Sequence, residues 1–147
     1  MSVPSTAAEL IDHILTRFHE THRRELPGIV ALARELEGKG ATPTLADDLD
    51  VMAKALEMHM FKEEMRLFPM MEQGGNSLIV RLIDDMQAEH GLHGDEVAHI
   101  EALLQALPAA GAGSALASLR TAWTGFLADL AEHTQLEDER LFPMFRH

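Results

Sequence analysis

The sequence predicts an all-α protein, an up-down-up-down four-helix bundle, from three observations. Turn-forming residues cluster in three places, EGKGATPT, EQGGNS and PAAGAGS, near residues 37–44, 72–77 and 108–114. The four segments between them are each about 30 residues long and rich in Ala, Leu, Met and Glu, with few β-branched residues. Their apolar residues recur at spacings of three and four, the period of an amphipathic helix. Four such helices with short connections pack as antiparallel neighbours around one core.

The first segment carries two histidines on faces that helical periodicity does not reconcile. Its apolar stripe is formed by Ile11, Leu15 and Phe18. His22 lies at the centre of that stripe, whereas His19 lies roughly 60° away from it. Pro27 removes a backbone donor, so we expect the helix to kink or restart nearby, which would bring the two faces together. The residues alone therefore leave open whether His19 or His22 points inward.

The other three segments each place polar residues inside an apolar stripe. These polar residues are His59 and Glu63 in the second segment, His90 in the third, and His133 and Glu137 in the fourth. The apolar residues around them are Met52, Leu56, Met60 and Leu67, then Ile79, Ile83, Met86 and Val97, and finally Leu119, Trp123, Phe126, Leu127, Leu130 and Leu141. Histidines and glutamates should therefore face the core.

The chain repeats itself. The sequence HMFKEEMRLFPM (His59 to Met70) returns as HTQLEDERLFPM (His133 to Met144), and the pair His19-x-x-His22 returns as His90-x-x-His93. The chain is thus a duplicated helix pair that carries His-x-x-His and then His-x-x-x-Glu. A proline lies six residues after each glutamate, at Pro69 and Pro143. Each is best explained as a kink or an end of the helix, packed by the phenylalanine that precedes it.

Buried imidazole and carboxylate groups need partners, and a shared metal site supplies them. A histidine and a glutamate four residues apart lie on one helix face, so each motif can offer one nitrogen to a metal and one carboxylate that bridges to a second. Four histidines, two bridging carboxylates and a solvent bridge give about ten bonds, against roughly twelve for two six-coordinate ions. About two coordination positions therefore remain for a small molecule, unless His22 or His93 occupies them. A set this rich in histidine favours binding or exchange over the chemistry of a classical enzyme.

Composition agrees with a metal site and excludes other classes. There are nine histidines and 24 carboxylates but no cysteine, so disulfides, thiolate zinc sites and cysteine-ligated clusters are ruled out. The net charge of −12 disfavours nucleic acid and anionic lipid surfaces. No apolar run could span a membrane, and the N-terminus lacks the pattern of a signal peptide. We expect one domain over residues 1–147, cytoplasmic and monomeric or dimeric.

The motifs resemble a known family over nearly the whole chain. They are DHILTRFHETHRRELPGIVALA, HMFKEEMRLFPM, AEH ending at His90, and LAEHTQLEDERLFP, and in this order they resemble the hemerythrin-like (HHE cation-binding) domains. Within that family they are most similar to the di-iron Repair of Iron Centres (RIC) proteins. The resemblance implies two iron ions joined by an oxo, hydroxo or water bridge, with both glutamates as carboxylate bridges. The implied ligands are His19, His59, Glu63, His90, His133 and Glu137.

Two features of RIC proteins are not found in these 147 residues. One is a further ligand histidine after the first helix, where this chain reads EGKGAT, and the other is a cysteine-containing N-terminal domain. The resemblance implies handling of iron, NO or O2 in nitrosative or oxidative stress, or repair of damaged iron–sulfur proteins. The alternatives are an oxygen carrier or sensor of the hemerythrin type and a non-redox zinc-binding domain. His13, His99 and His147 are expected at the surface.

Overall fold

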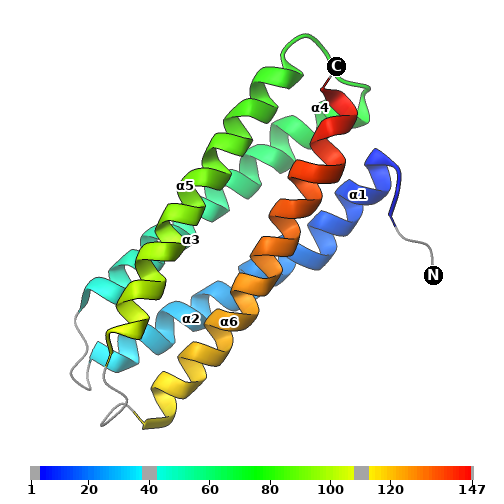
Figure 1. Cartoon of the computed structure of the whole chain (residues 1–147). Helices are drawn as coiled ribbons and strands as arrows, with labels where there is room; N and C mark the ends of the chain where they lie inside the picture. The colour runs from blue at the N-terminus through cyan, green and yellow to red at the C-terminus, as the bar shows by residue number, and fades with distance from the viewer. Residues whose placement is uncertain (1–3, 38–42, 108–112, 147) are drawn as a thin grey trace.

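The structure, a computed structural model, describes residues 4–37, 43–107 and 113–146. Within these ranges the chain folds into long helices joined by turns and contains no strand. Figure 1 shows four helical runs that lie side by side and alternate in direction. The predicted all-α, up-down-up-down bundle is confirmed.

Three of the four runs change their winding along their length. The first run comprises α1 (Ala7–His13), η1 (Ile14–His19) and α2 (Glu20–Glu37), and the second comprises α3 (Pro43–Lys62), η2 (Glu63–Leu67) and α4 (Phe68–Glu72). The third run is the single helix α5 (Ile79–Gln105). The fourth run comprises α6 (Gly113–Leu136), η3 (Glu137–Leu141) and η4 (Phe142–Phe145). The segments η1, η2 and η3 are π-helical turns, and η4 is a 3₁₀ helix. A π turn holds one residue more than an α-helical turn and shifts the face on which later residues lie.

Local signals define the helix ends. The hydroxyl of Thr6 accepts the Glu9 N–H while the Glu9 carboxylate accepts the Thr6 N–H, a capping box at the start of α1. After α4 the chain turns through Gly74 and Gly75, whose φ angles are 97° and 85°, a region that suits glycine. The Gly75 N–H donates to the Met70 carbonyl at 2.8 Å, which closes the second run.

The apolar core consists of two layers. The larger layer joins α2, α3, α5 and α6, with Trp123 and Phe126 among its buried members. The smaller layer joins α1, α4, the start of α5 and the end of the fourth run, with Phe68 and Phe142 in its interior. In every run the predicted inward histidines and glutamates lie between the parts that form these layers. A polar layer is therefore enclosed between two apolar ones.

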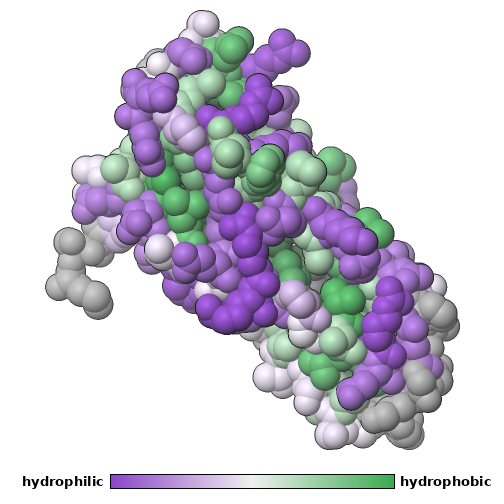
Figure 2. Space-filling model, turned by 180° about the vertical axis from the view of Figure 1, so that it is seen from behind, coloured by the Kyte–Doolittle hydropathy of each residue, from purple (hydrophilic) through white to green (hydrophobic). Residues whose placement is uncertain are grey.

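The outer surface mixes polar and apolar side chains. Figure 2 shows hydrophobic residues interspersed with hydrophilic ones over the face that it displays. Within the described ranges, no helix combines the length and the apolar composition that crossing a bilayer requires.

Candidate metal centre

Each π turn lies where a predicted ligand enters the core. The N–H of Glu20 donates to the Leu15 carbonyl five residues earlier, and that turn ends at His19. The N–H groups of the phenylalanines that follow η2 and η3 donate in the same way to the carbonyls of Glu63 and Glu137. A proline follows each of these phenylalanines, and its ring clashes with the carbonyl of the residue four positions before the proline. This clash favours the wider π turn over an α-helical turn.

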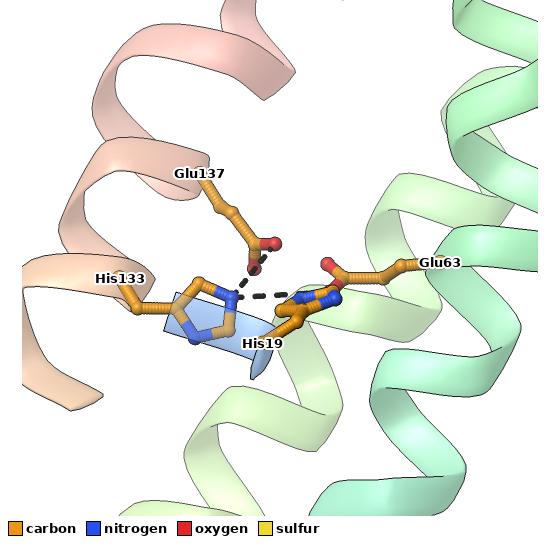
Figure 3. A group of neighbouring side chains, drawn as sticks. All are labelled: His19, Glu63, His133 and Glu137. Carbon is orange, nitrogen blue, oxygen red and sulfur yellow. Dashed lines mark hydrogen bonds and ion pairs between the residues drawn. The ribbon is translucent and has the colours of Figure 1, made fainter. Parts of the chain in front are cut away.

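The first group of converging side chains is drawn in Figure 3. It consists of His19, Glu63, His133 and Glu137, which come from three helical runs and are all buried. The Nε2 atom of His19 lies 3.1 Å from Oε1 of Glu63. The Nε2 atom of His133 lies 3.1 Å from Oε2 of Glu137 and 4.0 Å from Oε1 of Glu63. One donor atom from each of the four residues lies within 4.8 Å of the others.

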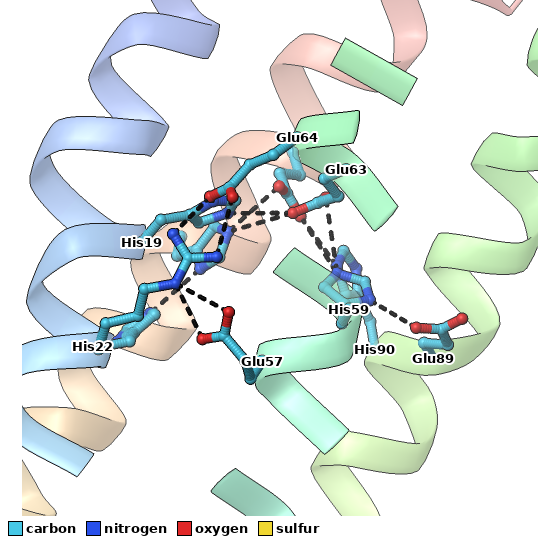
Figure 4. Close-up of polar contacts among 11 residues, drawn as sticks. His19, His22, Glu57, His59, Glu63, Glu64, Glu89 and His90 are labelled. Carbon is cyan, nitrogen blue, oxygen red and sulfur yellow. Dashed lines mark hydrogen bonds and ion pairs between the residues drawn. The ribbon is translucent and has the colours of Figure 1, made fainter. Parts of the chain in front are cut away.

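A second group shares the same two glutamates and adds His59 and His90 (Figure 4). The Nε2 atom of His90 lies 2.9 Å from Oε1 of Glu137. The Nε2 atom of His59 lies 3.5 Å from Oε2 of Glu63 and 4.0 Å from Oε1 of Glu137. Each carboxylate therefore directs one oxygen toward each histidine pair.

The other ring nitrogen of each of these histidines has a partner outside the two groups. The Nδ1 atoms of three of them face carboxylates: His19 faces Glu64 at 2.7 Å, His59 faces Glu89 at 2.9 Å, and His90 faces Asp138 at 2.9 Å. The Nδ1 atom of His133 instead faces Nε2 of His22 at 3.2 Å. Such partners fix the orientation of each ring and direct Nε2 toward the interior.

The outer carboxylates and two buried phenylalanines hold this arrangement in place. Arg23 donates to both oxygens of Glu64, at 2.8 Å and 2.9 Å, and Lys62 donates to Glu89 at 2.7 Å. The ring of Phe68 stacks on His19, and the ring of Phe142 stacks on His90. The repeated Phe-Pro sequence thus supports the histidines, although the helix does not end at either proline.

The structure places both His19 and His22 in the interior. The π turn η1, which ends at His19, shifts both histidines relative to the stripe that begins at Ile11, while α2 continues through Pro27 without a restart. The expected restart near Pro27 is therefore wrong, and the expected kink stays a prediction. Of the two histidines, only His19 faces the shared carboxylates, whereas His22 lies behind His133.

Opposing effects act on the histidine pKa values. Burial lowers the pKa of His59, but the nearby carboxylates of Glu137 and Glu63 outweigh this effect and raise the pKa to about 11. Burial likewise lowers the pKa of His90, but Asp138 and Glu137 raise it to about 9. Without a metal, protons therefore balance the charge of the carboxylates in this layer.

The two buried histidines outside the shared groups, His22 and His93, differ from the four within them. Burial, together with the neighbouring histidines, lowers the pKa of His22 to about 3 and that of His93 to about 4. Both rings are neutral at pH 7. The ring of His93 lies 5.0 Å from the ring of His59, centroid to centroid.

Of the three histidines predicted at the surface, His99 is exposed, His13 is half-buried, and His147 lies outside the described residues.

The family profile of the hemerythrin HHE cation binding domain matches residues 10–145. The chain belongs to this family. The family predicted from the sequence motifs is thereby confirmed, and its description names cation binding.

This hemerythrin-family chain is also similar to curated relatives named "Iron-sulfur cluster repair protein YtfE". Those from Yersinia pseudotuberculosis serotype IB (strain PB1/+) and from Yersinia pestis (strain Pestoides F) are each 38% identical over 140 residues. The match covers 91% of this chain and 63% of each relative. The chain thus spans less than two thirds of the length of the curated relatives it matches.

The side chains of this hemerythrin-family chain fit a pair of metal ions. Nε2 of His59 and Oε2 of Glu63 are buried and have no hydrogen-bond partner among the described residues. An unpaired buried donor or acceptor is costly, and a cation between the two atoms removes that cost. The donor set of imidazoles and carboxylates suits a borderline metal such as iron or zinc. The segment EGKGAT stands where the family has its further ligand histidine, and apart from Glu37 it lies outside the described residues.

Sequence reasoning missed the outer partners of the histidines. Glu64 and Asp138 directly follow the two inward glutamates, and Glu89 directly precedes His90. Glu64 and Asp138 occupy matching positions of the repeat, and that match was a usable signal for both. No comparable signal identified Glu89, because the matching position of the first half is Phe18.

Proposed function

We propose that the chain holds two iron ions, one between each histidine pair. His19 and His133 bind one ion, His59 and His90 bind the other, and Glu63 and Glu137 bridge both. The observation that carries this proposal is the pair of carboxylates, each of which directs one oxygen to each histidine pair. Iron bound there would supply redox chemistry and a coordination position for a small ligand such as NO or O2.

We infer further that this centre serves iron–sulfur cluster repair under nitrosative or oxidative stress, by donating iron to damaged iron–sulfur proteins. The name of the Yersinia relatives and the balance of ligands support this role. Four imidazoles with only two inward carboxylates differ from the carboxylate-rich sites of ferritin-like oxidases and favour binding and exchange. The protein would thus act by binding and exchange.

The experiment loads the chain with Fe²⁺ without oxygen and mixes it, with dithionite as electron donor, with an iron–sulfur dehydratase whose [4Fe–4S] cluster has lost its labile iron by oxidation. Recovery of dehydratase activity, with matching loss of iron from the chain, is the expected result. The matched control is the Glu63→Ala/Glu137→Ala double variant, which lacks both proposed bridges. Recovery that is equal with the control would contradict iron donation by this centre.

The reaction with gases separates this role from oxygen carriage. A repair protein should form a stable NO complex and lose iron readily to a chelator. A carrier should bind O2 reversibly over many cycles and retain its iron. If the protein is purified with zinc alone and takes up no iron, this result would favour the alternative of a non-redox zinc-binding domain.

A further inference from the structure

The seam between α5 and α6 is hollowed beside the second histidine pair. Within the described ranges, close backbone approaches join α2 to α3 and α6, and α3 to α5, while α5 and α6 approach each other less closely. A groove of about 350 Å³ runs along this seam, and its lining includes His90, His93, Gly94, Thr134 and Asp138. One predicted ligand of the centre therefore borders a surface groove.

His93 is a buried histidine for which the proposed centre has no use. Its side chain lines the groove, and only 7% of the residue is exposed. Its counterpart in the repeat, His22, is 1% exposed and faces His133. The rings of His59 and His90 lie 4.9 Å apart, and that of His93 lies 5.0 Å from His59. The neutral imidazole of His93 thus lies between the centre and the groove.

The charges of its lining distinguish this groove from two others in the described part of the chain. The groove between α2 and α3 is lined by Arg23 and Lys54 together with two carboxylates, and the groove beside Glu89 is lined by Lys62 and Arg66 together with two carboxylates. The α5–α6 groove is lined by no lysine or arginine, and Asp138 and Glu139 belong to its lining. A cation would meet the most favourable field in the α5–α6 groove.

We propose that the α5–α6 groove is a transfer site for a divalent cation, in which His93 takes the ion between the His59–His90 pair and solvent. This proposal rests on the proposed metal centre. The transfer exchanges one imidazole nitrogen for another and involves no change of oxidation state. His93 acts as a transient ligand, and the acidic side chains at the groove concentrate the ion.

The test measures the release of Fe²⁺ from the loaded chain to bipyridine, followed by absorbance without oxygen, after the iron content of each sample has been determined. His93→Gln removes the transfer ligand, and Gly94→Leu fills the groove while leaving His93 in place. A Cβ atom added at Gly94 meets no atom within 4 Å, so we expect this position to accept a side chain. The controls are His99→Gln, at an exposed histidine, and Gly91→Leu, at a glycine of the same helix with equally open surroundings.

We expect both variants to keep the native iron content and to release iron roughly ten-fold more slowly, while the controls behave like the native chain. Unchanged release from His93→Gln would overturn the role of His93, and unchanged release from Gly94→Leu would overturn the route. Faster release or lower iron content in His93→Gln would show a resident ligand and overturn transfer. A native chain that takes up no iron would instead refute the proposed centre.

Discussion

The imidazole of His22 supports the imidazole of His133: Nε2 of the first lies 3.2 Å from Nδ1 of the second. The neutral ring of His22 can accept the Nδ1 proton of His133 at its Nε2, and in that tautomer Nε2 of His133 is free to bind a metal beside the carboxylates. The other three inward histidines have a carboxylate in this place. The two metal positions should therefore differ in strength.

Loss of His22 should weaken one metal position and spare the other. In His22→Ala the ring of His133 loses its orienting partner, so the affinity of the His19–His133 position should fall by roughly ten-fold. Titration calorimetry with Zn²⁺ measures the two affinities separately. His99→Ala is the control, because it removes an exposed histidine that lies outside the metal centre. Equal weakening of both positions would contradict the assignment.

Loss of one shared carboxylate should affect both positions. Glu137→Gln removes the charge that faces His133 on one side and His90 on the other. We expect metal content to fall for both ions, and the melting temperature of the loaded protein to fall by roughly 10 °C, since bound metal stabilises the fold. Glu96→Gln on α5 serves as the control. A Glu137→Gln variant that retains its full metal content would rule out bridging.

Glu64 and Glu57 both bind Arg23, but only Glu64 also contacts His19. Glu64→Gln should therefore lower metal affinity at the His19–His133 position by roughly ten-fold, because the uncharged amide makes His19 a poorer ligand. Glu57→Gln removes the neighbouring partner of the same arginine and should leave metal affinity unchanged. Equal effects of the two substitutions would assign the result to Arg23 rather than to the histidine contact.

The stability of the metal-free protein should be greatest near neutral pH. His59 and His90 have raised pKa values, so the stability that their protons contribute is present below about 6.5 and is lost as pH rises toward 9 and then 11. His22 and His93 have lowered pKa values, so stability is also lost as pH falls from about 6.5 toward 4 and then 3.

Metal should change the alkaline side of this profile. Metal binding requires neutral imidazoles and displaces the protons, so the loaded protein should not lose stability between pH 7 and 9 as the metal-free protein does. Melting temperatures measured across pH with and without Zn²⁺ test this difference. Parallel curves on the alkaline side would contradict proton displacement at these histidines.

The sequence predicted the bundle and most of the converging residues because both follow from periodicity. The stripes of the second and fourth runs contain His59, Glu63, His133 and Glu137, and the structure brings these residues together. Periodicity could not choose between His19 and His22, because η1 adds a residue that only the folded backbone reveals. The outer carboxylates escaped prediction because their role depends on contacts between helices.

The central claim is that the chain holds two metal ions between two histidine pairs and two shared glutamates. The most direct measurement is the metal content per chain, by mass spectrometry, of protein purified without added metal and without a metal-binding tag. We predict close to two iron ions per chain in the native protein, with both lost in the Glu63→Ala/Glu137→Ala variant. A native chain with no bound iron, or a double variant with undiminished content, would contradict the claim.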